Sequence, residues 1–107
     1  MTVLLETFDG GIATLTMNRP EARNAMSGDM IAALLEALPR LGADSNVRCV
    51  VLTGAGSAFC AGGDVKGFAA SGGSGKPPTL EQRAQTLRPG FEVARLLHEL
   101  PKPTLAA

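Results

Sequence analysis

The sequence predicts an α/β fold in which a β-hairpin and a further strand form a sheet that packs against an amphipathic helix. Two β-prone runs, residues 3–8 and 12–17, are separated by an Asp-Gly pair, which favours a hairpin. Apolar residues recur at helical spacing over residues 30–38, which predicts a helix with one apolar face. Residues 50–52 are apolar without polar alternation. Such a run is typical of a strand that is covered on both faces in a parallel sheet.

The first helix has recognisable start and stop signals. Ser27 is the predicted N-cap, and Asp29 in the first turn complements the helix dipole. Pro39 removes a backbone donor near the other end, so we expect a bent or frayed last turn. Gly42 is the predicted stop.

The carboxyl-terminal half of the chain predicts a second helix and the beginning of another strand. The helix runs from Thr79 to about Leu100, and Pro89-Gly90 should kink or split it. Its later half buries leucines. The last residues, 104–107, are expected to begin a strand.

Composition limits the class of protein. The chain has 107 residues, of which 45% are hydrophobic, and its ten basic residues balance ten acidic ones. One hydrophobic core is therefore possible, and no net field would attract nucleic acid or an anionic membrane. No apolar run approaches the roughly 20 residues that span a bilayer, and no signal peptide is evident. Cys49 and Cys60 form no disulfide framework. These features predict a reduced, cytoplasmic setting, with a small organic molecule as the partner.

Two motifs suggest chemistry but fit it poorly. Residues 54–59 begin like a dinucleotide-binding turn, yet Phe59 replaces the third glycine and no acidic residue follows at the spacing that a ribose contact needs. Cys60 could be a nucleophile, but the single histidine, His98, is distant in sequence. A small buried filler is the simpler interpretation of Cys60.

The segment 58–66 is the strongest site motif. Its glycines allow the backbone to turn sharply and to bring N–H groups close to a ligand, and Asp64 could cap a following helix. Bare backbone donors aimed at one point stabilise a developing oxyanion. On these residues alone, a loop with a capped helix is an equally good interpretation.

Four segments together resemble the crotonase (enoyl-CoA hydratase/isomerase) superfamily. They are residues 18–25, 50–54, 59–65 and 101–107, in the order and approximate spacing of that group. The resemblance covers essentially the whole chain and implies a crotonase-like ββα spiral that is incomplete here. Residues 1–107 would form the amino-terminal portion of one such domain. Residues 69–78 would be a flexible Gly/Ser-rich loop.

The resemblance also implies the site. The backbone N–H of Gly63 would be one of two oxyanion donors for a thioester carbonyl, while the second donor and the acid/base carboxylates would belong to the remainder of the domain. The coenzyme A groove would be lined by the chain near Arg23, Ala25 and Ala61. Asp64, Val65 and Lys66 would border the acyl end. For Arg23 and Lys66, ordinary solvated surface charges are an equal alternative.

The implied activity is that of an acyl-CoA thioester enzyme. The main candidate is an enoyl-CoA hydratase of fatty acid metabolism. Coenzyme A would be part of the substrate, with no metal and no separate cofactor. The complete protein would be a homotrimer or hexamer. Enoyl-CoA isomerisation or another reaction of the same scaffold is an alternative, because a fold does not fix a reaction. A catalytically silent fragment that acts as a binding or assembly module is another.

Overall fold

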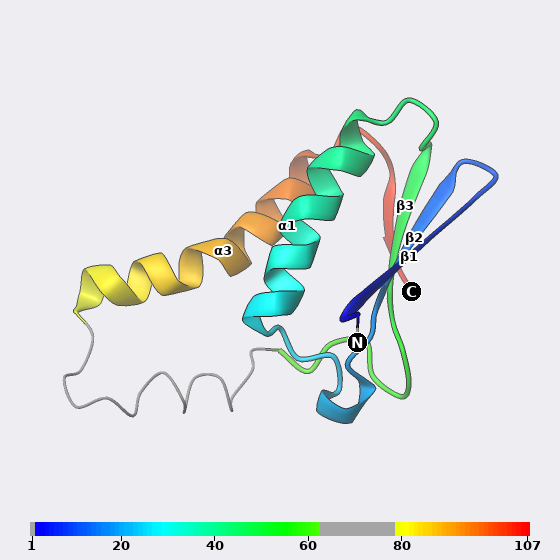
Figure 1. The fold of residues 1–107 in the computed structure, drawn as a ribbon. Helices are drawn as coiled ribbons and strands as arrows, with labels where there is room; N and C mark the ends of the chain where they lie inside the picture. Colours follow the sequence, from blue (N-terminus) through cyan, green and yellow to red (C-terminus); the bar gives the residue numbers. More distant parts are fainter. Residues whose placement is uncertain (1, 63–78) are drawn as a thin grey trace.

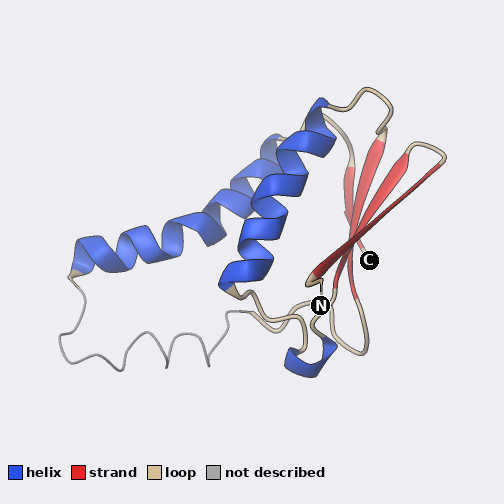
Figure 2. Ribbon diagram, viewed as in Figure 1, coloured by secondary structure: helices blue, strands red, loops and turns tan. Residues whose placement is uncertain are grey.

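A computed structural model describes residues 2–62 and 79–107. Within these ranges a sheet with the strand order β1-β2-β3-β4 packs against two helices. Figure 2 shows both helices on the same side of the sheet, where α1 lies against the strands and α3 against α1. In chain order the elements are β1 (Leu4–Asp9), β2 (Ile12–Met17), the 3₁₀ turn η1 (Pro20–Ala22), α1 (Gly28–Ala43), β3 (Cys49–Gly54), α3 (Leu80–Glu99) and β4 (Thr104–Ala106).

The predicted hairpin is confirmed. Strands β1 and β2 pair antiparallel, from Leu4 opposite Met17 to Asp9 opposite Ile12. Gly10 and Gly11 form the connecting turn, and both have positive φ, as a two-residue hairpin turn requires. The hairpin presents Ala13, Leu15 and Met17 to the core.

Strand β3 joins the sheet parallel to β2 and to β4, as the apolar run predicted. The expectation that β3 is covered on both faces is wrong for the described residues. Val50 is fully buried, whereas Val51 is only partly buried, because both helices pack on one face of the sheet. The opposite face of β3 has no layer of described residues over it.

Helix α1 supplies most of the core. The Ser27 hydroxyl accepts a hydrogen bond from the Met30 N–H at 3.2 Å, so the predicted N-cap is confirmed. The apolar stripe of the helix meets the buried faces of β2 and β3, and Val93 of α3 joins the cluster. The fully or nearly buried side chains of this core are Ala13, Leu15, Met17, Met30, Leu34, Ala37, Leu38, Leu41, Val47, Val50 and Val93.

The end of α1 lies one residue beyond the predicted stop. The helix continues through Pro39 and ends at Ala43, directly after Gly42. Two contacts from the carboxyl-terminal part of the chain lie against this end. A Cβ on Gly42 would lie 2.9 Å from the Leu100 side chain, so the residue directly after α3 packs closely here. The ammonium of Lys102 donates to the carbonyls of Leu41 (2.8 Å) and Asp44, which satisfies acceptors that a helix end leaves without partners.

Helix α3 begins where predicted and is not split. Thr79 and Gln82 form a reciprocal capping box at its start. The helix passes through Pro89, and Figure 1 shows its ribbon changing direction near the middle. Its second half packs on α1 through Val93, with Leu96, Leu97 and Leu100 partly buried beside it. Among the described residues, no helix is both long and apolar enough to cross a lipid bilayer.

An ion pair joins α1 to β1 and makes a pH-dependent contribution to stability. The Arg40 guanidinium donates to the Glu6 carboxylate, with Nη1 3.0 Å from Oε2, and to Glu36 one turn earlier. Hydrogen bonding to Arg40 lowers the pKa of Glu6, against a smaller opposing effect of desolvation. Because the pKa is lowered in the folded state, this stabilisation is present above the unfolded pKa of about 4.3. It is lost as the pH falls through the folded value.

We therefore expect Arg40→Met to raise the pKa of Glu6 and to remove at most about 1 kcal/mol of stability, since the pair is partly exposed. NMR titration of the Glu6 carboxyl in the folded protein measures the shift. Arg48→Met is the matched control, because no hydrogen bond or ion pair joins Arg48 to Glu6 and only Arg40 lowers the pKa of Glu6. An unchanged Glu6 titration in Arg40→Met would contradict the assigned cause.

Candidate functional site

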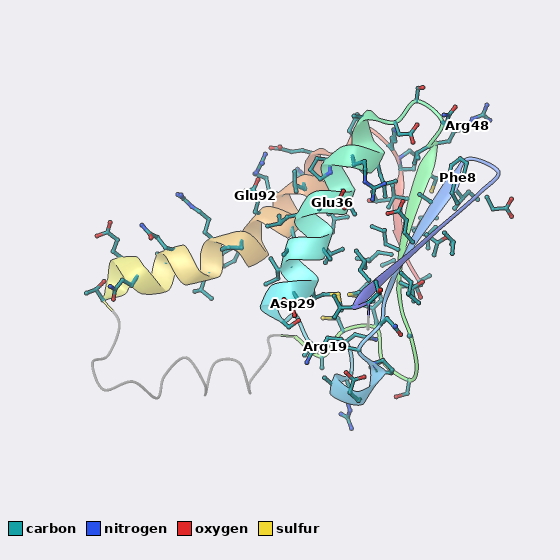
Figure 3. All side chains as sticks on the ribbon, in the orientation of Figure 1. Phe8, Arg19, Asp29, Glu36, Arg48 and Glu92 are labelled. Carbon is teal, nitrogen blue, oxygen red and sulfur yellow. The ribbon has the colours of Figure 1, made fainter. Side chains whose placement is uncertain are left out.

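Two loops meet at the carboxyl ends of β2 and β3. Because these strands are parallel, the loops that follow them, residues 18–26 and 55–62, leave the sheet at the same edge. This is the edge at which open α/β sheets bind ligands. Figure 3 places Arg19 here, and Phe8 and Arg48 at the opposite end of the sheet. A surface groove of about 460 Å³ lies beside Phe8 and Arg48, away from the loop pair.

Asn24 joins the two loops. It is fully buried, and among the side chains that the structure describes it is the one buried polar group. Its Nδ2 donates to the carbonyls of Ala55 (3.0 Å) and Ala58 (2.8 Å), and its Oδ1 accepts from the Arg19 N–H at 2.7 Å. The backbone of Asn24 is left-handed, with φ of 57°, a conformation that asparagine tolerates better than most residues. Both ends of the amide are therefore satisfied by backbone groups.

Gly54 makes room for this amide. A Cβ at that position would lie 2.5 Å from the Phe59 carbonyl oxygen, 2.6 Å from that of Ala58 and 2.7 Å from Asn24 Nδ2. No side chain fits within these distances. The first glycine of the dinucleotide-like motif thus serves the contact between two loops.

The predicted binding residues Arg23, Ala25 and Ala61 come together in this loop pair. The Ala61 N–H donates to the Arg23 carbonyl at 3.0 Å, and the Met26 N–H donates to the Gly62 carbonyl at 2.7 Å. The Arg19 guanidinium donates to the Ala25 carbonyl at 3.2 Å. Backbone hydrogen bonds therefore hold residues 61–62 against residues 23–26.

The remaining predicted site residues, Gly63, Asp64, Val65 and Lys66, lie outside the described residues, as does the predicted loop 69–78. The described chain leads up to them. Gly62 has φ of 104°, which is a conformation that side-chain-bearing residues rarely adopt. The backbone thus turns sharply directly before Gly63.

The described surroundings of Cys60 give it no partner for nucleophilic catalysis. Its thiol lies 3.9 Å from the Gly62 carbonyl and packs beside the core, whereas His98 is exposed on α3. In the parts of the chain that the structure describes, no cluster of three or more His, Cys, Asp or Glu side chains could hold a metal ion.

Sequence reasoning missed the roles of Asn24 and Gly54. Both are in segments that carried the resemblance, but neither was expected to hold the site together. The available signal was an asparagine inside a polar loop, since asparagine accepts positive φ and can bond to backbone groups. That signal names no partner.

Comparison with known proteins assigns the family. The profile of the enoyl-CoA hydratase/isomerase family matches residues 12–107. The chain belongs to this family. Within the crotonase superfamily, it is 36% identical over 107 residues to 1,2-epoxyphenylacetyl-CoA isomerase of Escherichia coli. That alignment covers all of this chain and 40% of the isomerase. It is 39% identical over 99 residues to enoyl-CoA hydratase EchA19 of Mycobacterium tuberculosis. That alignment covers 92% of this chain and 35% of the hydratase.

A solved structure shows the same fold. The crystal structure of an enoyl-CoA hydratase from Mycobacterium smegmatis superposes with a TM-score of 0.84 at 39% identity. The match covers 99% of this chain and 39% of that one. The chain therefore spans about 40% of the length of the relatives it matches, and the strands and helices of the described residues are an incomplete crotonase fold.

Proposed function

We propose that this chain is the amino-terminal part of an acyl-CoA thioester enzyme that adds water reversibly across the double bond of a 2-enoyl-CoA. The observation that carries the proposal is the loop pair. Backbone hydrogen bonds hold Ala61 and Gly62 at the carboxyl edge of the sheet, directly before the residue whose N–H is the proposed oxyanion donor. The names of the matched hydratases support the same reaction class.

In this proposal the Gly63 N–H donates to the thioester carbonyl oxygen as negative charge develops there. A fixed donor stabilises the enolate-like transition state more than the ground state, because the bond strengthens as the charge grows. The rest of the protein would supply the second donor and the carboxylates that move the proton and the water.

The proposed substrate is held by both sides of the loop pair. Arg23, Ala25 and Ala61 would line the coenzyme A groove, with Asp64, Val65 and Lys66 at the acyl end. Coenzyme A is then part of the substrate, and no separate cofactor takes part. We propose that the complete protein is a homotrimer or hexamer. Its proposed compartment is the cytoplasm, and its proposed role is in fatty acid metabolism.

Isomerisation is a second proposed reaction for the same site. The observation that favours it is the match to an epoxyphenylacetyl-CoA isomerase, which is 36% identical over the whole chain. Hydration and isomerisation both begin with a polarised thioester carbonyl. The groups that move the proton or the water decide between them.

An assay on two proteins tests the proposal. One is the 107-residue chain, and the other is a protein of the relatives' length that carries these residues. We expect the longer protein to consume the conjugated thioester of a 2-enoyl-CoA and the short chain not to, because it would lack the second donor and the carboxylates. A longer protein that binds coenzyme A thioesters without turnover would favour the silent binding module. Turnover by the short chain alone would contradict the assignment of the missing groups.

A further inference from the structure

Asn24 occupies an unusual position for a residue that binds no ligand in the proposed function. Its side chain is fully buried, yet its contacts are all with loop backbone: Arg19 on its own loop, and Ala55 and Ala58 on the other. It also lies in left-handed backbone directly after Arg23, whose φ is 52°. Two consecutive non-glycine residues in this region store strain that a fold keeps only where the surroundings enforce it.

The geometry connects this amide to the site. Ala58 O is 2.8 Å from Nδ2, and three residues later the Ala61 N–H is bonded to the carbonyl of Arg23, the neighbour of Asn24. The segment from Ala58 to Ala61 is therefore fastened at both ends to residues 23 and 24. Gly62 continues the pairing through its bond from Met26. Displacement of the amide would release the first of these anchors.

We propose that Asn24 is the positioning residue of the acyl-CoA site. Its carboxamide fixes the backbone path of residues 58–62. These residues lead directly to the proposed oxyanion donor, so the amide sets the position from which that donor would reach the thioester carbonyl. The inference rests on the proposed function. It assigns Asn24 no contact with the substrate, since the side chain is buried and its donors and acceptor are already engaged.

The test uses the protein of the relatives' length with butyryl-CoA that carries ¹³C at the thioester carbonyl. This saturated thioester cannot be hydrated, and its infrared carbonyl stretch falls when donors polarise the bond. Asn24→Gly removes the amide and accepts positive φ, so it separates hydrogen bonding from backbone strain. Asn18→Ala is the matched control. Asn18 belongs to the same loop, but its side-chain amide donates to the Thr2 carbonyl at 3.1 Å and not to the 55–62 loop.

We expect Asn24→Gly to lose most of the carbonyl shift and to lower kcat about 10-fold or more, since small misplacements of a reacting group are costly. The KM for a 2-enoyl-CoA should change less than kcat, because the misplaced bond matters most in the transition state. Asn18→Ala should keep both the shift and kcat. Thermal melts ensure that each variant is measured while folded.

The outcomes separate the two proposals. If the unsubstituted protein shows no carbonyl shift with butyryl-CoA, the proposed oxyanion site is wrong. If it shows the shift and a folded Asn24→Gly variant keeps both the shift and kcat, Asn24 does not position the site. Should Asn24→Gly not fold, Asn24→Asp decides, because it keeps the acceptor for Arg19 and replaces two N–H donors with at most one O–H donor. A full shift and normal kcat in that variant would overturn the inference.

Discussion

Gly54→Ala should separate the two loops and destabilise the protein by about 3 kcal/mol, at the upper end of what overpacking costs. The added methyl would lie 2.5 and 2.6 Å from the carbonyl oxygens of Phe59 and Ala58. Both obstacles are backbone, which cannot rotate away as a flexible side chain can. Asn24 Nδ2 lies 2.7 Å from the same point. Relief of the clash therefore requires the 55–59 loop to move or the Asn24 amide to leave its position.

Urea unfolding of Gly54→Ala beside Gly28→Ala measures this effect. Nothing lies within 4 Å of a Cβ on Gly28, and its φ is not in the left-handed region. Gly28 is also the first residue of α1, so alanine there should leave stability within about 0.5 kcal/mol of the parent or raise it slightly. Equal stability of the two variants would mean that the close approach at Gly54 is not a real constraint.

Local signals in the sequence predicted the elements well. The hairpin, the Ser27 cap and the start of α3 after Thr79 depend on residues close in the chain, and the structure has all three. The end of α1 was predicted to within one residue. Gly42 was the predicted stop, and the helix ends at Ala43, where Leu100 and Lys102 from the other end of the chain contact it.

The site was predictable only in part, because its contacts join residues that are far apart in the sequence. Glycines and a matched motif indicated which backbone segment to examine, and the structure brings Arg23, Ala25 and Ala61 together. The residue that joins the loops was not predicted, because the acceptors of Asn24 lie 31 and 34 positions away. A single sequence gives no indication of which distant carbonyls a buried amide will meet.

Two substitutions at Gly63 test the proposed oxyanion donor. Gly63→Pro deletes the backbone N–H, whereas Gly63→Ala keeps it and adds only a methyl group. If the backbone at residue 63 tolerates negative φ, the pair separates hydrogen bonding from bulk. The loss should appear in kcat, because the bond to the carbonyl oxygen is strongest when charge has built up.

The most direct measurement is therefore kcat for a 2-enoyl-CoA in these two variants of the longer protein, with matching thermal melts and coenzyme A binding to exclude a collapsed loop. We predict a fall of about 10²-fold or more for Gly63→Pro, with Gly63→Ala close to the parent. A folded Gly63→Pro variant that binds coenzyme A and turns over normally would show that Gly63 is not an oxyanion donor, and would contradict the proposed site.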